Sequence, residues 1–163
     1  HHVMARRQRQ MCIRDRFLGA VFVWLVYLPH WKQTESSADK LSVFATAPAI
    51  KNWFANYLSE ALATTALVII AGALAEYGNT YNFSDGSLPY IFGFVVWGIG
   101  LSLGGPTGYA INPARDLGPR FAHAVLPIAG KGRSNWNYSW VPVAGPLTGV
   151  LVGLSIIKLF LLG

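Results

Sequence analysis

The stretch from residue 104 to residue 120, GGPTGYAINPARDLGPR, constrains the fold more than any other part of the chain. Its glycines and prolines prevent a regular helix at its beginning. Asn112 followed by Pro113 then predicts a helix N-terminus, because asparagine caps free backbone N–H groups and proline fits the first helical position. The helix can continue to about Leu126, just before Pro127.

The composition places this stretch in a membrane protein. Of 163 residues, 53% are hydrophobic and 12% are charged, whereas about a quarter of the residues in a soluble domain are charged. An arginine inside the bilayer costs about 2.5–3.5 kcal/mol. We therefore expect Arg115, on the first turn of the predicted helix, to face a wet cavity. A short helix that starts in mid-membrane with an arginine on its first turn indicates a solute site.

Three apolar segments are predicted to cross the membrane, at residues 53–77, 88–104 and 138–162. Residues 17–31 are apolar but too short for a full span. The predicted fold class is an all-α membrane protein, a helical bundle with a re-entrant half-helix at residues 112–126. In the last span, glycines recur every four residues and permit close contact with another helix, either within the chain or between subunits. They are Gly145, Gly149 and Gly153.

Residues 1–16, HHVMARRQRQMCIRDR, contain five of the thirteen basic residues and no apolar signal-peptide core. We interpret them as a non-native or artefactual leader, with a basic juxtamembrane anchor as the alternative, and residues 17–163 as a membrane domain. The net charge of +6 therefore does not indicate nucleic-acid binding. The single Cys12 excludes an internal disulfide. No metal-ligand spacing and no nucleotide motif is present, so we expect no metal and no cofactor.

Residues 108–116, GYAINPARD, resemble the second Asn-Pro-Ala signature of the aquaporin superfamily, the major intrinsic proteins, at Asn112, Pro113 and Ala114. The aspartate after the arginine resembles the glycerol-conducting branch, the aquaglyceroporins. The resemblance covers about residues 17–163 and corresponds to the C-terminal part of the family's fold, with the N-terminal repeat missing. It implies that residues 17–31 end span three, that 53–77 and 88–104 are spans four and five, and that 138–162 is span six.

The resemblance also implies a pore-lining set. Asn112 can donate to a passing hydroxyl, and the helix N-terminus beneath it carries about half a positive charge. Arg115 lies one turn on, with donors that suit polyol oxygens and a charge that repels cations. Tyr109 is expected to form an apolar wall against it. Gly100, where water-selective relatives have histidine, is expected to leave room for a three-carbon solute; the alternative is a packing glycine.

Other residues are expected to support or extend this site. The irregular backbone of Gly108 to Ala110 is expected to present carbonyls to the pore. Glu60 is expected to accept N–H bonds from the re-entrant loop, with a proton relay as the alternative. We interpret Asp116 as a structural partner, Arg120 as a vestibule or helix-end charge, and His123 as a satisfied interior or helix-end histidine.

The resemblance implies a passive channel for glycerol and other small neutral solutes, with some water permeability, that excludes ions and protons. Glycerol, water and small polyols would be the permeants, and the protein would be a multi-pass homotetramer in the plasma membrane bilayer. The alternatives are a water-selective aquaporin and a non-conducting membrane fragment or assembly subunit. An enzyme is not expected, because a hydrolase built on Glu60, Asp116 or His123 lacks supporting spacing. Without an opposing half-helix, we expect this chain alone not to conduct.

Overall fold

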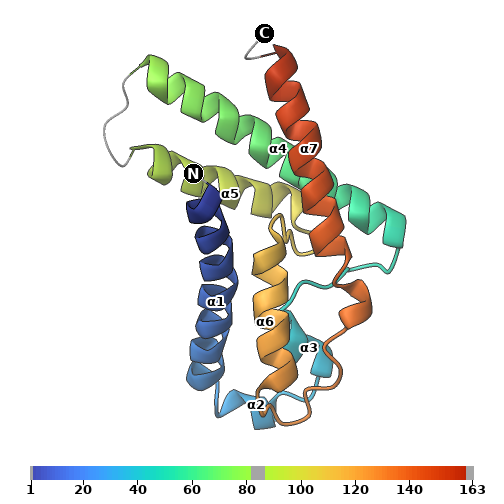
Figure 1. The fold of residues 1–163 in the computed structure, drawn as a ribbon. Coiled ribbons are helices and arrows are strands. Elements are labelled where there is room, and N and C mark those ends of the chain that lie inside the picture. The colour runs from blue at the N-terminus through green and yellow to red at the C-terminus, as the bar shows by residue number, and fades with distance from the viewer. Residues whose placement is uncertain (1, 82–86, 161–163) are drawn as a thin grey trace. The chain divides into compact units, whose positions relative to one another are not determined.

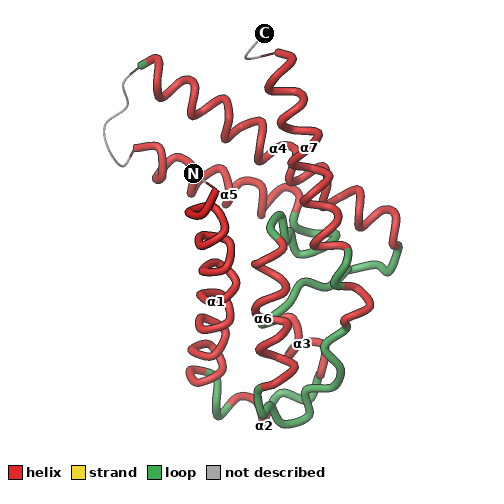
Figure 2. The backbone as a smooth tube through the Cα atoms, viewed as in Figure 1, coloured by secondary structure: helices red, strands yellow, loops and turns green. Residues whose placement is uncertain are grey.

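The computed structural model describes the backbone of residues 2–81 and 87–160, and the side chains of residues 12–78, 80–81 and 87–160. Within these ranges every regular element is a helix (Figures 1 and 2), which confirms the predicted all-α class. The helices are α1 (His2–Val26), α2 (His30–Gln33), α3 (Ser37–Ser42), α4 (Trp53–Thr80), α5 (Ser87–Leu103), α6 (Pro113–Val125), a 3-10 turn (Trp136–Tyr138) and α7 (Val141–Phe160).

The chain divides into two compact units, each built from two separate segments. The first unit contains the residues up to Ala47 together with Asn112–Trp140, and therefore α1, α2, α3, α6 and the 3-10 turn. The second unit contains Pro48–Ile111 and the residues from Val141 onward, and therefore α4, α5 and α7. The junction between Ile111 and Asn112 falls immediately before the predicted helix start.

In the second unit, the periodic glycines of α7 lie against α4. A Cβ atom on Gly145 would lie 2.6 Å from the Cβ of Glu60, one on Gly149 would lie 2.5 Å from the carbonyl oxygen of Ala61, and one on Gly153 would lie 2.8 Å from Val68. The sequence left open whether these glycines serve packing within the chain or between subunits. The structure uses them within the chain, where they bring the two helix backbones close together.

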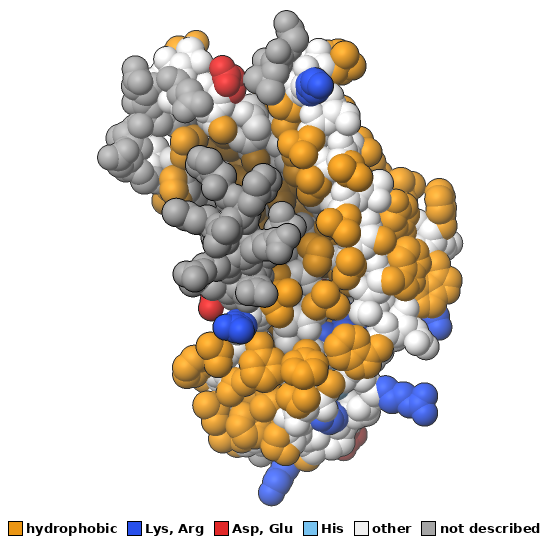
Figure 3. All heavy atoms as spheres, in the orientation of Figure 1, with side chains coloured by type: hydrophobic (Ala, Val, Ile, Leu, Met, Phe, Trp, Pro, Cys, Tyr) orange, Lys and Arg blue, Asp and Glu red, His pale blue; other side chains and the backbone are white. Residues whose placement is uncertain are grey.

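Two helical stretches, Trp53–Gly78 and Trp136–Phe160, are long and apolar enough to cross a membrane. A third, Ser87–Leu103, is apolar but shorter. Many large hydrophobic side chains on these helices are exposed, and in Figure 3 they follow the visible face of α7. Exposed apolar side chains along helices of this length are what a lipid-facing surface requires.

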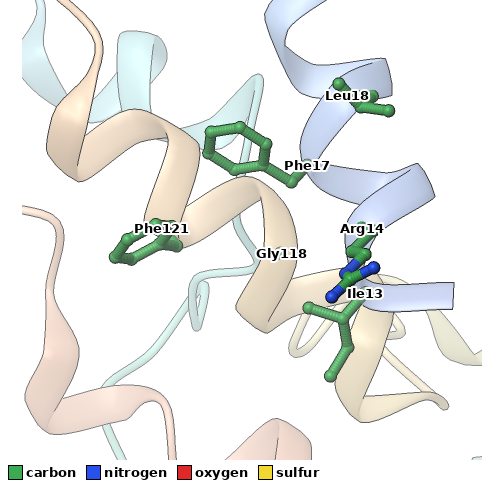
Figure 4. Close-up of a pocket in the computed structure, with 6 residues that line it drawn as sticks. All are labelled: Ile13, Arg14, Phe17, Leu18, Gly118 and Phe121. Carbon is green, nitrogen blue, oxygen red and sulfur yellow. The ribbon is translucent and has the colours of Figure 1, made fainter. Parts of the chain in front are cut away.

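In the first unit, α1 packs on α6 around a glycine. A Cβ atom on Gly118 would lie 3.0 Å from the carbonyl oxygen of Ile13 and 3.0 Å from the Cβ of Arg16. Beside this contact lies a hollow of about 410 Å³ that Phe17 of α1 and Phe121 of α6 help to line (Figure 4). Further along, the core joins α1, α2, α6 and the loops; it contains Ala20, Trp31, Phe44, Ala122 and Ile128.

Some predicted bounds differ from the observed helices. Residues 2–26 form one helix, so the predicted leader boundary at residue 16 is not a break in secondary structure. That helix ends at Val26 rather than Trp31, because Pro29 disfavours helical backbone at the residue before it and starts α2 instead. The origin of residues 1–16 stays a prediction.

The later bounds shift by a few residues. α4 continues to Thr80, three residues beyond the predicted end, and α7 begins at Val141, where Pro142 fits the first helical turn. Residues 161 and 162 of the last predicted span lie outside the described residues.

Candidate functional site

The helix α6 begins as the sequence predicts. Asn112 has extended backbone (φ −157°, ψ 121°), and its Oδ1 accepts a hydrogen bond of 2.9 Å from the backbone N–H of Ala114. Pro113 occupies the first helical position, where its missing N–H is not needed. Because the cap uses Oδ1, the side-chain NH2 group of Asn112 takes no part in it. The exposed asparagine and the positive end of the helix dipole therefore lie at the same point.

Arg115 lies on the first turn of α6 and is partly buried. Within the first unit it lines a hollow of about 360 Å³. The other residues that line this hollow come from α1, from the loop after α3 and from α6; they are Asp15, Arg16, Gly19, Ala20, Val23, Val43, Phe44 and Pro119. Arg115 therefore lies beside a hollow, and the wet cavity expected there, with its role in permeation, stays a prediction.

The loop that precedes Asn112 belongs to the second unit and has an unusual backbone. Gly108, Tyr109 and Ile111 have positive φ angles of 79°, 40° and 43°. Glycine adopts this left-handed region readily, but a tyrosine and a β-branched isoleucine do so at a cost of about 1–3 kcal/mol each. Such a conformation persists only where the surrounding structure enforces it.

Glu60 of α4 enforces this backbone. Its side chain is 1% exposed, and its Oε1 accepts from the Thr107 hydroxyl at 2.6 Å and from the Ala110 N–H at 2.9 Å. Its Oε2 accepts from the Ile111 N–H at 2.9 Å. The N–H bonds expected from the re-entrant loop are thus present. The carboxylate is fully engaged by the loop, so the proton-relay alternative gains no support.

These hydrogen bonds also set the direction of two carbonyl groups. In a trans peptide the C=O points opposite to the N–H of the same peptide plane, and the described chain has no cis peptide bonds. The N–H groups of Ala110 and Ile111 point at Glu60, so the carbonyls of Tyr109 and Ala110 point away from it. This direction is the one that the expected ladder of acceptors requires, while the lining of a pore by them stays a prediction.

The ring of Tyr109 lies over two glycines of the second unit. A Cβ atom on Gly100 would lie 2.9 Å from the Tyr109 Cζ, and one on Gly104 would lie 2.6 Å from the Cδ1. The tyrosine ring therefore occupies the space that a side chain at position 100 would need, which agrees with the packing alternative, and the room expected for a solute stays a prediction. Any extra width of a pore at Tyr109 would arise indirectly, because the glycine lets the tyrosine ring lie close to α5.

Asp116 and Arg120 form a buried ion pair in the first unit. Both side chains are 0% exposed, and the guanidinium binds the carboxylate through two contacts, Nε to Oδ1 at 2.6 Å and Nη2 to Oδ2 at 2.7 Å. Thr46 donates to Asp116 Oδ2 from both its N–H and its hydroxyl, at 2.9 and 2.5 Å. The structural role expected of Asp116 is thus visible in its contacts.

The expectation that Arg120 is a vestibule or helix-end charge is wrong. Its remaining donors bind the carbonyls of Thr46 at 2.8 Å, Ser134 at 2.7 Å and Asn135 at 3.0 Å. Every donor therefore has a partner inside the first unit, which is why the charge can be buried. The spacing of Asp116 and Arg120, four residues apart on a helix, was the sequence signal that could have indicated the pair.

His123 and Lys131 complete the far end of α6. His123 is fully buried with its Nδ1 2.8 Å from the Ser134 hydroxyl, and its Nε2 has no hydrogen-bond partner among the described residues. The expected satisfied histidine is thus satisfied on one side. Lys131, which the sequence did not single out, donates to three carbonyls that end the helix, those of His123, Ala124 and Leu126, at 2.7–2.9 Å. No cluster of metal-ligating side chains occurs within the described ranges.

In the part of the chain that the structure describes, every regular element is a helix, two helices are long and apolar enough to cross a bilayer, and a capped half-length helix begins at a strained loop. The chain matches the family model of the major intrinsic protein over residues 8–156, and it belongs to that family. The predicted membership of the aquaporin superfamily is thereby confirmed. The match begins nine residues before residue 17, where the sequence analysis placed the start of the resemblance.

Several relatives are named for glycerol uptake. The chain is 54% identical, over 88% of its length, to a probable glycerol uptake facilitator protein of Thermotoga maritima. It is 59% identical over 81% of its length to the glycerol uptake facilitator protein of Bacillus subtilis, and 53% identical over 83% to glycerol uptake facilitator protein 3 of Lactiplantibacillus plantarum. The matched parts cover 60%, 47% and 55% of these three relatives, so the chain spans about half of their length.

Proposed function

We propose that the protein carrying this sequence is a passive transmembrane channel for glycerol and other small neutral solutes, with some water permeability. One observation supports this above the others: the helix that begins at Asn112 presents Arg115 on its first turn to a hollow of about 360 Å³. The names of the relatives support glycerol as the permeant. Because those relatives are longer than this chain, the proposal concerns the intact channel.

The chemistry of the two units suits a polyol. In the first unit, Asn112 and Arg115 provide N–H donors beside the positive end of α6, and this positive field repels hydronium and metal cations. In the second unit, Glu60 turns the carbonyls of Tyr109 and Ala110 away from itself, as acceptors. A glycerol hydroxyl both donates and accepts, so donors and acceptors of this kind can replace the water that it loses.

The wider context belongs to the same proposal. The protein would lie in the plasma membrane with several spans, and would assemble as a homotetramer with one pore in each subunit. The exposed apolar side chains of α4, α5 and α7 support a bilayer environment. The protein would transport rather than catalyse, with no cofactor, and Asp116 would serve structure.

Solute flux tests the proposal. The intact channel is reconstituted into vesicles and followed by stopped-flow light scattering after mixing with glycerol. We expect shrinkage followed by re-swelling as glycerol enters. Shrinkage without re-swelling would indicate the water-selective alternative. A response no faster than that of vesicles without protein would indicate a non-conducting subunit.

The assignment of Arg115 is tested in the same vesicles. We expect Arg115→Val to admit larger polyols or ions, because the cationic barrier and the donors are removed together. Arg133→Val, at an exposed position of the same unit, serves as the matched control and should conduct as the unmodified protein does. Identical solute selectivity in the two variants would show that Arg115 does not contribute to the selectivity of the channel.

A further inference from the structure

The first unit contains a buried titratable side chain for which the proposed channel has no use. His123 is 0% exposed. Its Nδ1 lies 2.8 Å from the hydroxyl of Ser134, and its Nε2 has no hydrogen-bond partner within the described part of the chain. One ring nitrogen therefore links α6 to the loop that follows it, the other is buried without a partner among the described residues, and the ring of Phe44 lies 5.6 Å away between centroids.

The charged side chains near His123 are either cations or a carboxylate that already forms an ion pair. Lys131 donates to the carbonyl of His123 at 2.9 Å, and Arg120 donates to the carbonyl of Ser134 at 2.7 Å. The nearest buried carboxylate, Asp116, is engaged by Arg120 and Thr46. A proton on the imidazole would therefore add a third positive charge beside two others, with no acidic side chain left to balance it.

Other elements of this unit supply no counter-charge. On α1, Arg16 lies against Gly118, more than one helical turn before His123. On α3, Lys40 donates to the carbonyl of Ala129 at 2.6 Å and is cationic as well. The remaining ionisable side chains of α1, α2, α3 and the loops of this unit that the structure describes are exposed; they are Cys12, Arg14, Asp15, Tyr27, His30, Lys32, Glu35, Asp39 and Arg133.

We propose that the contact between His123 and Ser134 is an acid-sensitive latch that acts together with the hydrogen bonds of Lys131 and Arg120 to hold residues 131–135 on α6. With a neutral imidazole the latch is closed. Protonation places a charge where burial and two cations oppose it, and the segment relieves this cost by moving away so that water reaches the ring. Burial, then Lys131, then Arg120 lower the pKa of His123 below its usual value of 6.5, in agreement with this geometry.

The position of His123 along α6 lets protons reach it. It lies eleven residues after Asn112, or roughly 16 Å at 1.5 Å per residue. The hydrocarbon core of a bilayer is about 30 Å thick, so with Asn112 at its midplane the histidine lies near the membrane surface. This step alone rests on the proposed function, and the latch itself does not.

Amide hydrogen exchange tests the latch. The chain is purified in detergent micelles, and exchange of residues 131–135 is measured at pH 7.5 and pH 5.0 by mass spectrometry, with correction for the intrinsic pH dependence. Three proteins are compared: the unmodified chain, His123→Asn and His30→Asn. The asparagine at 123 keeps a polar group near the place of Nδ1 but does not titrate. His30 is exposed and provides the matched control.

We expect protection of residues 131–135 in the unmodified chain to fall at pH 5.0, by up to about tenfold for each pKa unit by which His123 is lowered. His30→Asn should behave in the same way, and His123→Asn should show no pH dependence. Equal protection at both pH values in the unmodified chain would overturn the latch, and so would an equal loss in His123→Asn.

A second measurement covers the case in which His123→Asn does not fold. The ring titration of His123 in the unmodified chain is followed by NMR. A pKa of 6.5 or above would overturn the proposal, and a lower pKa with concurrent shifts of the Ser134 amide would support it. Neither readout depends on solute flux, so a failed latch and a failed channel assignment remain distinguishable.

Discussion

Replacement of Glu60 by glutamine probes how a buried carboxylate shapes the loop before Asn112. Glutamine has the same size, so its oxygen can still accept from Thr107 and Ala110. Its NH2 group, however, then faces the N–H of Ile111, where the carboxylate accepts a bond of 2.9 Å. The NH2 group of the glutamine and the N–H of Ile111 are both donors, so this hydrogen bond is lost. The bonds from Thr107 and Ala110 remain, but their acceptor is no longer charged.

The expected cost follows from these contacts. A hydrogen bond to a charged group contributes about 1.5–3 kcal/mol, so the loss of one and the weakening of two should lower the free energy of unfolding by about 2–4 kcal/mol. Relaxation limits the loss. Ile111, at φ 43°, is held in a conformation that costs about 1–3 kcal/mol, and part of that strain is released when its N–H bond is broken.

Unfolding of the purified chain by SDS in detergent micelles, followed by tryptophan fluorescence, measures this difference. Glu76→Gln makes the same chemical change at an exposed position of the same helix and should alter stability by less than about 0.5 kcal/mol. Amide exchange at Ala110 and Ile111 should accelerate only in the Glu60 variant. If both variants unfold together with the unmodified chain, the carboxylate does not hold the loop and the reasoning fails.

Two further substitutions are measured by the same SDS titration. Asp116→Asn removes the charge from a buried ion pair and should lower the free energy of unfolding by about 3–5 kcal/mol. Asp39→Asn, on the exposed first turn of α3, should lower it by less than about 1 kcal/mol. Equal losses in the two variants would show that the pair is not buried. Gly149→Ala would place a Cβ atom 2.5 Å from a carbonyl of α4 and should cost about 1–3 kcal/mol. Gly93→Ala, with nothing within 4 Å, should be neutral or stabilising by about 0.5–1 kcal/mol, and a matching loss there would contradict close packing of α4 and α7.

The features that the sequence predicted correctly are those that depend on short-range chemistry. The cap at Asn112 acts on a residue two positions away, and the proline at 113 fits the same turn. The apolar segments determine the helices of the second unit. The contacts of Glu60 with residues 107–111 were predicted through resemblance to a family, since no spacing rule connects positions 47 to 51 residues apart.

The features that the sequence did not predict depend on loops. Arg120 is buried because its donors meet carbonyls of Thr46 and Ser134, which lie 74 and 14 residues away in segments without periodic pattern. The contact between Gly100 and Tyr109 was not predicted for a related reason. The left-handed backbone of Tyr109 places its ring on the glycine, and a positive φ at a tyrosine is not signalled by its residue type.

Among the described residues, two carboxylates are buried: Glu60, which precedes Asn112 in the sequence, and Asp116, which follows it. Glu60 receives three hydrogen bonds from residues 107–111, and Asp116 receives two from Thr46 and two from Arg120. A carboxylate with this many donors is poorly suited to accept a proton or to attack a substrate, which argues against the hydrolase interpretation. Each carboxylate instead fixes the backbone on its own side of the helix start, so the geometry at Asn112 depends on two charges that are themselves buried.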